Sequence, residues 1–183
     1  MEQEKMSAKR IAAELAIYVV ILLVCIFIVP RYVIQRTLVD GESMESTLQD
    51  KDNLLVDKCV FKLTGIDRFD IVVFYPFGKE DDPEDYFIKR IIGLPGETIQ
   101  IQGEDIYING EILEEHYGKD PIDDAGVASD PITLGEDEYF VLGDNREISR
   151  DSREFGAVNI KDIAGHAVFR MYPFDSFGPL TNK

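Results

Sequence analysis

The apolar pattern is strongest at the start of the chain. Residues 11–29 read IAAELAIYVVILLVCIFIV, and their single charged residue, Glu14, lies near the beginning of the run. Nineteen helical residues extend about 28 Å at ~1.5 Å each, close to the ~30 Å hydrocarbon core of a bilayer. A cleavable secretory signal would need small residues after the apolar run, but VPRYVIQR contains no A-x-A pattern. We therefore expect an uncleaved membrane anchor.

Basic residues flank this anchor unevenly. Three precede it and two follow it: Lys5, Lys9, Arg10, Arg31 and Arg36. Because positive charge favours the cytoplasmic side, we expect the N-terminus to lie in the cytoplasm. The predicted organisation is a cytoplasmic segment at residues 1–10, a single transmembrane anchor at 11–30 that ends at Pro30 and Arg31, and an extracytoplasmic domain at 31–183.

Beyond the anchor the pattern is typical of β-strands. Short runs rich in Val, Ile, Phe and Tyr alternate with turn residues. The expected strands are residues 53–63, 69–77, 86–94, 98–102, 138–145 and 166–173. Within 105–113, Asn109-Gly110 separates two apolar stretches and predicts a hairpin. No long segment with a helical period follows the anchor, so the predicted fold class is mainly β, with an antiparallel sheet.

The composition narrows the function classes. A net charge of −16 argues against nucleic acid as a partner, because phosphate binding needs a basic face, and against broad docking on an anionic lipid surface. A hydrophobic content of 45% fits a globular core. Two acidic stretches interrupted by Pro or Gly, residues 79–85 and 116–138, are expected to be solvated surface loops.

Cysteine and histidine offer little chemistry. Cys25 lies inside the apolar run, so a disulfide with Cys59 is not expected. His116 and His166 share no motif with each other or with Cys59, which leaves no basis for a metal site or a Ser-His-Asp triad. We expect no metal and no cofactor.

A serine-lysine pair is the remaining candidate. The stretch VDGESMESTL, residues 39–48, places Ser43 between acidic residues, either in a plain surface loop or as a nucleophile near the membrane. A serine needs a base, and a lysine can serve only if its pKa falls from ~10.4. Of Lys58, Lys62 and Lys89, the last lies in the most apolar strand, YFIKRIIGL, where burial and the adjacent cation Arg90 are expected to lower its pKa. An outward lysine on a half-buried strand is the alternative.

A polar cluster follows the expected strand EYFVL. GDNREISRDSREFG, residues 143–156, brings Ser149, Asp151 and Arg153 close together. On an extended chain, Asp151 and Arg153 would point to the same side and could form an ion pair. A polar turn is the alternative interpretation.

Four stretches taken together resemble the type I signal peptidases. SMESTL (43–48) resembles the family motif SMxPTL, and RFDIVVF (68–74) resembles RGDIVVF. KRIIGLPGET (89–98) resembles KRxxGxPGD, and residues 143–156 resemble GDNxxxSxDSRxxG. Order and spacing match from the anchor to about Pro173. The short segment 97–138 is similar to that of the compact Gram-positive members, which lack the large extra domain of many Gram-negative ones.

The chain departs from these motifs at a few positions. Ser46 stands where the family has Pro, Phe69 where it has Gly, and Glu97 where it has Asp. Ile148 takes a position that is often polar in the family.

The resemblance implies a role for each site residue. Ser43 would attack the scissile carbonyl and Lys89 would accept its proton. Ser149 would orient Lys89, and Asp151 and Arg153 would hold their loop. The remaining implied groups are Asp144 and Asn145, which shape the loop, the backbone N–H groups of Ser43 and Gly41 as oxyanion donors, and Met44 in a substrate pocket.

The implied function is a membrane-bound serine endopeptidase that removes signal peptides from exported preproteins. The signal peptidase fold and a preference for Ala-x-Ala sites would accompany it, with membrane lipid as a partner and a monomeric state. Three alternatives are a dedicated pilin or surface-protein processing enzyme, a self-cleaving Ser-Lys protease like the SOS repressors, and a non-enzymatic membrane-anchored β-domain. The SOS-type enzymes need a DNA-binding head, and a membrane span occupies that place here.

Overall fold

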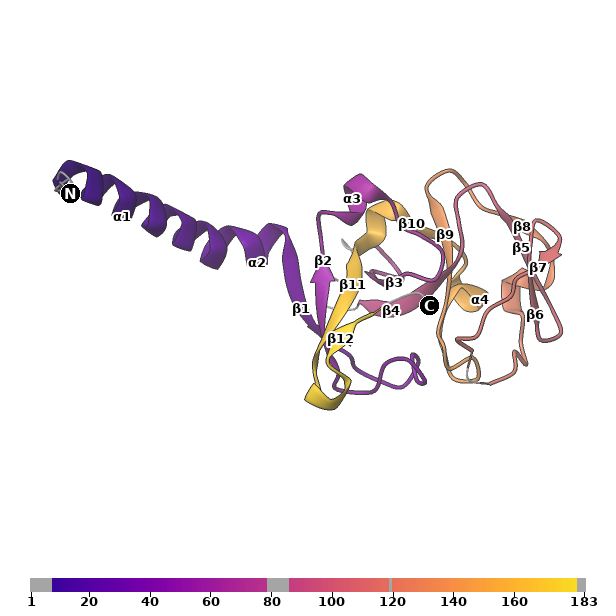
Figure 1. Cartoon of the computed structure of the whole chain (residues 1–183). Helices are drawn as coiled ribbons and strands as arrows, with labels where there is room; N and C mark the ends of the chain where they lie inside the picture. Colours follow the sequence, from indigo (N-terminus) through magenta and orange to yellow (C-terminus); the bar gives the residue numbers. More distant parts are fainter. Residues whose placement is uncertain (1–7, 79–85, 119, 181–183) are drawn as a thin grey trace.

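A helical arm projects from a rounded β domain (Figure 1). The computed structural model describes residues 8–78, 86–118 and 120–180. The arm consists of α1 (Ala8–Leu23), a π-helical turn (Val24–Ile28) and α2 (Val29–Tyr32). Its segment Arg10–Val29 is long and apolar enough to cross a membrane, and none of it is buried against the domain.

The helical arm continues past Pro30, at the end of the apolar run, to Tyr32. Proline lacks a backbone N–H, but it is tolerated in the first turn of a helix, where that group has no intrahelical partner. Pro30 occupies such a position in α2, directly after the π-helical turn, in which the Val29 N–H donates to Val24 O five residues back. The π-helical turn shifts the backbone hydrogen bonds from four to five residues back, so the helix continues without needing an N–H from Pro30.

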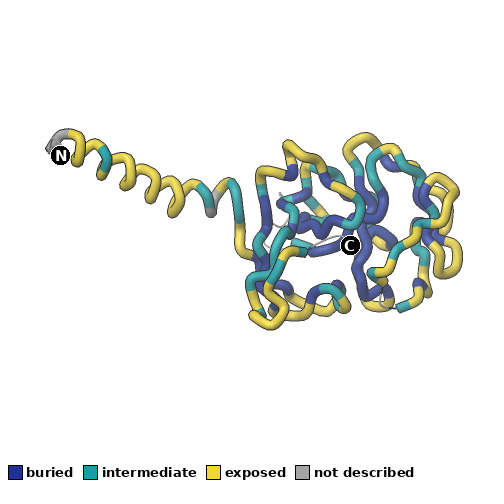
Figure 2. Tube along the Cα trace, viewed as in Figure 1, coloured by how far each residue is buried: buried dark blue, intermediate teal, exposed yellow. Residues whose placement is uncertain are grey.

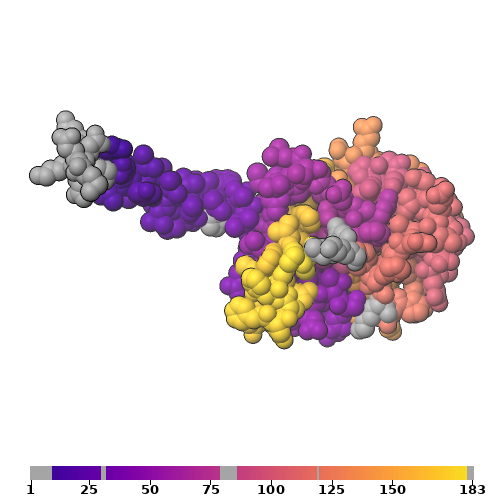
Figure 3. Space-filling model, viewed as in Figure 1, coloured from indigo at the N-terminus to yellow at the C-terminus, as the bar shows by residue number. Residues whose placement is uncertain are grey.

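The larger sheet carries the site. Its strands are β1 (Ile34–Leu38), β2 (Asn53–Asp57), β3 (Ile71–Phe74), β4 (Phe87–Gly93), β9 (Glu138–Leu142), β10 (Val158–Asn159), β11 (Ile163–Tyr172) and β12 (Gly178–Pro179). The order is β1-β2-β11-β3-β4-β9-β10, with β12 on β11, and the paired strands are antiparallel. The predicted mainly β, antiparallel fold class is confirmed. Figure 3 shows the C-terminal strands, in yellow, lying against N-terminal residues, in purple.

A smaller sheet lies beside it in the order β7-β6-β5-β8. Its strands are β5 (Thr98–Gln102), β6 (Asp105–Ile108), β7 (Glu111–Ile112) and β8 (Ile132–Thr133). The predicted hairpin is present between β6 and β7. Asn109 and Gly110 form its two-residue turn with φ of 54° and 85°, as a type I′ turn requires.

Several element predictions need correction. The strand expected at 53–63 ends at Asp57, because its carboxylate accepts the N–H groups of Cys59, Val60 and Phe61 and starts the short helix α3 (Phe61–Thr64). The strand β1 was not expected at all. The expected loop 116–138 is not fully solvated, since it contains β8 and a 3-10 turn. The expected loop 79–85 lies outside the described residues.

Figure 2 shows buried residues, in dark blue, in the middle of the domain, and one buried cluster joins the larger sheet to the smaller one. This cluster fills the smaller sheet and includes Ile122, Ala128 and Leu134 from the segment 116–138. A second cluster lies under the β1–β2 connection and includes Met44, Leu48 and Ile88. This second cluster packs against the β1–β2 connection, which carries the candidate site.

Candidate active site

Ser43 lies on the connection between β1 and β2, residues 39–52, which we call the serine loop. Two backbone hydrogen bonds close its neck: the Val39 N–H donates to Asp52 O at 2.8 Å and the Lys51 N–H to Val39 O at 2.9 Å. Met44 and Leu48 are 1% and 0% exposed and fasten the loop to the core. Ser43 itself stays half-buried, so the loop presents its hydroxyl from a fixed base.

Lys89 meets Ser43 from the neighbouring strand β4. Its Nζ lies 2.7 Å from the Ser43 Oγ and also donates to the Ile88 carbonyl at 3.1 Å. The side chain is only 4% exposed, so the alternative of an outward surface lysine is wrong. Residues that are 46 positions apart in the chain are thus in direct hydrogen-bond contact.

Burial controls the charge of this lysine. Loss of solvent lowers the pKa of the Lys89 amine from 10.5 to about 8, and the carboxylates of Asp151 and Asp144 oppose the shift. Only a neutral amine can accept a proton, and this pKa makes the neutral form accessible at mildly alkaline pH. The expectation that Arg90 helps to lower this pKa is wrong, because successive strand residues point to opposite faces and the Arg90 guanidinium pairs elsewhere.

Arg90 is the structural centre behind the dyad. It is 1% exposed and forms a two-point contact with Asp144, with Nε–Oδ1 at 2.8 Å and Nη2–Oδ2 at 2.6 Å. It also donates to Thr47 Oγ1 at 2.9 Å and to the Phe69 carbonyl at 2.8 Å. One guanidinium therefore joins the serine loop, the segment before β3 and the loop after β9.

The loop after β9 supports Ser43 from its other side. The Asn145 N–H donates to the Ser43 carbonyl at 3.1 Å. Gly143 lies so close that a Cβ there would be 2.5 Å from the same carbonyl and 2.1 Å from the Ser149 Oγ. No other residue fits without displacing the backbone. Asp144 and Asn145, both predicted to shape this loop, thus contact Arg90 and the serine loop, respectively.

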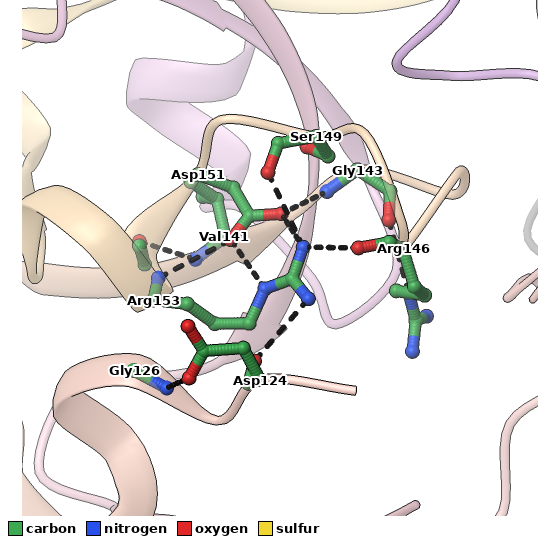
Figure 4. A network of polar contacts seen from close by, with 9 residues as sticks. Asp124, Gly126, Val141, Gly143, Arg146, Ser149, Asp151 and Arg153 are labelled. Carbon is green, nitrogen blue, oxygen red and sulfur yellow. Dashed lines mark hydrogen bonds and ion pairs between the residues drawn. The ribbon is translucent and has the colours of Figure 1, made fainter. Parts of the chain in front are cut away.

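Asp151 and Arg153 form the predicted ion pair, but not on an extended chain. Asp151 is the N-cap of α4 (Ser152–Phe155), and its carboxylate accepts the Arg153 N–H and both Nε and Nη2, at 2.8 and 2.9 Å for the side chain (Figure 4). It also accepts the Gly143 N–H at 3.1 Å. Arg153 Nη2 donates further to the carbonyls of Arg146 and Ser149. The pair therefore fixes the loop after β9 at several points.

Ser149 does not make the hydrogen bond that the resemblance implies. Its hydroxyl is buried and has no hydrogen-bond partner within the described ranges 8–78, 86–118 and 120–180, Lys89 included. Its backbone is well held, because its N–H donates to the Asn145 carbonyl at 3.1 Å. The structure thus places Ser149 next to Gly143 without a hydrogen bond to the lysine amine.

The two expected oxyanion donors differ. The Ser43 N–H has no hydrogen-bond partner in the part of the chain that the structure describes, so it is available to a ligand. The Gly41 N–H donates to Asp50 Oδ1 at 2.9 Å. The expectation that Gly41 supplies the second donor needs correction, because a carboxylate within the serine loop already uses that group.

A cleft of about 450 Å³ opens over Ser43 and Lys89. One wall is the end of β1 with the start of the serine loop, and the other is the start of β4. The lining residues are Leu38, Val39, Asp40, Gly41, Glu42, Ser43, Met44, Tyr86, Phe87, Ile88, Lys89, Ile148 and Arg150. Met44, predicted to line a pocket, is among them.

The other candidate bases lie away from this cleft. Lys58 and Lys62 line a separate hollow near α3 and Tyr32. His166, on β11, has its Nε2 at 3.4 Å from Asp70 Oδ1, and His116 is exposed. Neither histidine is among the residues that line the cleft over Ser43.

Comparison with known proteins gives one consistent answer. The family model described as signal peptidase, peptidase S26, matches residues 12–172. The chain belongs to this family. Signal peptidase I of Bacillus amyloliquefaciens is 35% identical over 186 residues, covering 95% of each chain. Signal peptidase IB of Staphylococcus aureus is 33% identical over 92% of this chain and 94% of its own.

Other relatives extend the comparison. Probable signal peptidase I-2 of Synechocystis is 37% identical over 153 residues, which is 82% of this chain and 69% of that protein. A crystal structure of signal peptidase I from Enterococcus faecalis is 34% identical and aligns with a TM-score of 0.45 over 55% of this chain and 95% of that chain. The family membership makes this chain a signal peptidase I, a serine protease that removes signal peptides.

Sequence reasoning missed four residues that build the signal peptidase site. Arg90 was considered only as a cation beside Lys89. Thr47, Arg146 and Tyr117, whose ring centroid lies 3.7 Å from the Arg90 Cζ, were not considered at all. Arg146 is 3% exposed, with Nε bonded to the Gly143 carbonyl at 2.9 Å. For the two arginines, the available signal was a charged residue inside or shortly after a buried strand, because such residues are buried only when paired.

Proposed function

We propose that Ser43 and Lys89 form the catalytic dyad with which this signal peptidase cuts its substrates. The observation that carries the proposal is the 2.7 Å contact between the Ser43 hydroxyl and the Lys89 amine, whose pKa burial lowers to about 8. The absence of either histidine from the lining of the cleft over Ser43 supports lysine as the base.

Each turnover begins with the neutral amine. The Ser43 Oγ attacks the scissile carbonyl carbon while Lys89 Nζ accepts the hydroxyl proton. The tetrahedral intermediate collapses as the C–N bond breaks, and Lys89 returns the proton to the leaving amine. An acyl enzyme remains on Ser43. Lys89 then takes a proton from a water that attacks the acyl carbon, and it returns this proton to the Ser43 Oγ as the ester bond breaks. Proton transfer therefore balances over the two steps without a further group.

The surrounding residues hold the dyad ready. The Ser43 N–H is proposed as an oxyanion donor, because no group among the described residues pairs with it. Ser149 is proposed to orient Lys89 once substrate is bound, and its buried, unpaired hydroxyl supports this role. Asp151 and Arg153 hold the loop that carries Ser149, and Asp144 and Asn145 fix its contacts to Arg90 and the serine loop.

The substrate is proposed to bind as an extended peptide between the two walls of the cleft. Residues 38–42 and 86–88 flank Ser43 with backbone on both sides, which suits strand-like pairing. The buried side chain of Met44 lines this cleft and is proposed to form a shallow pocket that admits only small residues. We infer a preference for preproteins whose signal peptides end in Ala-x-Ala, acted on by a monomer, because one chain forms the whole cleft.

The arm is proposed to anchor the enzyme in the cell membrane. Residues 11–30 would span the lipid, with 1–10 in the cytoplasm and 31–183 outside, where the cut site of an exported preprotein emerges. The exposed, apolar helix supports this arrangement. Protease added to spheroplasts is expected to digest the bulk of the chain, and protection of the β domain would show the opposite orientation.

The dyad is tested with purified full-length enzyme in detergent and a panel of preproteins. Ser43→Ala and Lys89→Ala are each expected to abolish cleavage, and the double variant should be no worse than either, because the two groups act as one unit. Lys62→Ala and His166→Ala are controls that should keep wild-type activity. Wild-type activity of Lys89→Ala would contradict the proposal.

A further inference from the structure

Tyr117 covers the guanidinium that organises the site. It lies in residues 114–118, which follow β7 and which we call the strap. The Arg90 Cζ is 3.7 Å from the centroid of the Tyr117 ring, a close stack of a cation on an aromatic face. Tyr117 does not line the cleft over Ser43; it lines a separate hollow with Thr47 and Arg90.

The strap is fastened to the serine loop and to the loop after β9. On one side, Ser46 Oγ donates to the Tyr117 carbonyl at 3.2 Å. On the other, the Tyr117 N–H donates to Glu115 at 3.1 Å, and Glu115 pairs with Arg146 Nη2 at 2.8 Å. Arg146 in turn donates to the Gly143 carbonyl. The ring of Tyr117 is thereby held between the two loops that bracket Ser43.

Two departures from the family motifs converge on this one residue. Ser46 replaces a proline and bonds the Tyr117 backbone, and Phe69 replaces a glycine and packs its ring 5.1 Å from that of Tyr117. Phe69 has φ of 74°, a left-handed conformation that a bulky side chain rarely adopts and that glycine takes freely. An aromatic residue kept in an unfavourable conformation points to a use for its ring.

We propose that Tyr117 is a positioning residue for the Ser43–Lys89 dyad and that it acts through Arg90. The inference rests on the proposed function of that dyad. Arg90 directly follows Lys89 in β4 and bonds Thr47 in the serine loop. It also bonds Asp144, whose neighbour Asn145 holds the Ser43 carbonyl. A tilt of the guanidinium is therefore passed to both members of the dyad, and misplacement of about 1 Å can cost a hundredfold in rate.

The test compares full-length variants in the preprotein assay. Tyr117→Leu is expected to lower kcat about tenfold, equivalent to about 1.4 kcal/mol, with KM within about twofold because Tyr117 lies outside the cleft. Tyr117→Phe keeps the ring and should restore kcat to within about twofold of wild type. Tyr107→Leu, on β6 of the smaller sheet, is the matched control and should keep wild-type kcat.

A second arm uses Phe69→Gly, in which the new glycine adopts the observed φ without strain and the fold is retained. If the Phe69 ring acts by holding Tyr117, this change lowers kcat in the wild-type background but adds nothing in the Tyr117→Leu background. Wild-type kcat in Tyr117→Leu, equal loss in the leucine and phenylalanine variants, or a loss in KM alone would overturn the inference. Wild-type activity of Lys89→Ala in the same assay would instead overturn the proposed dyad on which this inference rests.

Discussion

The buried lysine makes stability depend on pH in a way that one substitution can reveal. Lys89→Met keeps most of the apolar stem and removes the amine. A folded pKa of about 8 against 10.5 corresponds to a penalty of about 3 kcal/mol for charging the amine in the folded state. Below pH 8 both the folded and the unfolded chain hold the proton, so the wild type carries this penalty in full.

The direction of the pH dependence follows from the number of protons that the folded and the unfolded chain bind at this site. Between pH 8 and 10.5 the unfolded chain binds more protons at this site than the folded chain, so wild-type stability rises with pH relative to Lys89→Met. Near pH 7, Lys89→Met should therefore be more stable than the wild type. The gain is reduced by the stability that the hydrogen bond between Lys89 and Ser43 contributes to the wild type. Near pH 10 most of its advantage should be gone.

The measurement is thermal unfolding of full-length wild type and variant in a non-ionic detergent from pH 7 to 10, followed by circular dichroism. For a chain of this size, about 1 kcal/mol shifts Tm by roughly 2–4 °C, so the difference in Tm should change by roughly 6–12 °C over this range. Lys62→Met, at an exposed lysine, is the control and should show no such change. A difference that stays constant with pH would refute a buried amine and the proposed base with it.

Three further outcomes are expected. Gly143→Ala should remove most cleavage activity, measured on a preprotein, because a Cβ would lie 2.5 Å from the Ser43 carbonyl; full activity would show that the two loops move freely. Asp144→Ala should destabilise the fold by about 3–5 kcal/mol in urea unfolding, because it leaves buried Arg90 unpaired, whereas a loss below about 1 kcal/mol would show that Arg90 finds another partner. Asp57→Ala should cost about 1–2 kcal/mol, because three N–H groups at the start of α3 lose their acceptor, with activity retained; an inactive but stable variant would contradict this purely structural role.

Local patterns predicted the fold class and much of the larger sheet. Alternating and β-branched runs located β4, β5 and the β6–β7 hairpin, because those strands are bounded by turn residues that act over two or three positions. The end of β2 was misplaced because Asp57 caps a helix through its side chain, a competition that hydrophobicity does not show. The apolar run likewise did not indicate that the helix continues beyond Pro30, where a change in hydrogen-bond register permits the proline.

The contact of Ser43 with Lys89 was expected from motifs, but its supports were not. Arg90, Thr47 and Tyr117 come from three segments far apart in the sequence, and only the folded chain places them together. The free Ser149 hydroxyl and the engaged Gly41 N–H also depend on loop geometry at the scale of single hydrogen bonds. The spacing of residues along the chain does not predict which individual hydrogen bonds such loops form.

Lys89 and Arg90 are adjacent on β4 but point to opposite sides of the strand. Lys89 faces Ser43 in the cleft, and Arg90 faces Asp144 behind it. Exchanging the two residues would leave composition, net charge and strand propensity unchanged. It would nevertheless place a permanently charged guanidinium against Ser43 and a single-point ammonium against Asp144. The proposed dyad thus depends on the order of these two residues. A one-residue insertion within β4 would turn Lys89 to the opposite face of the strand and remove the base from Ser43 as completely as deleting the lysine.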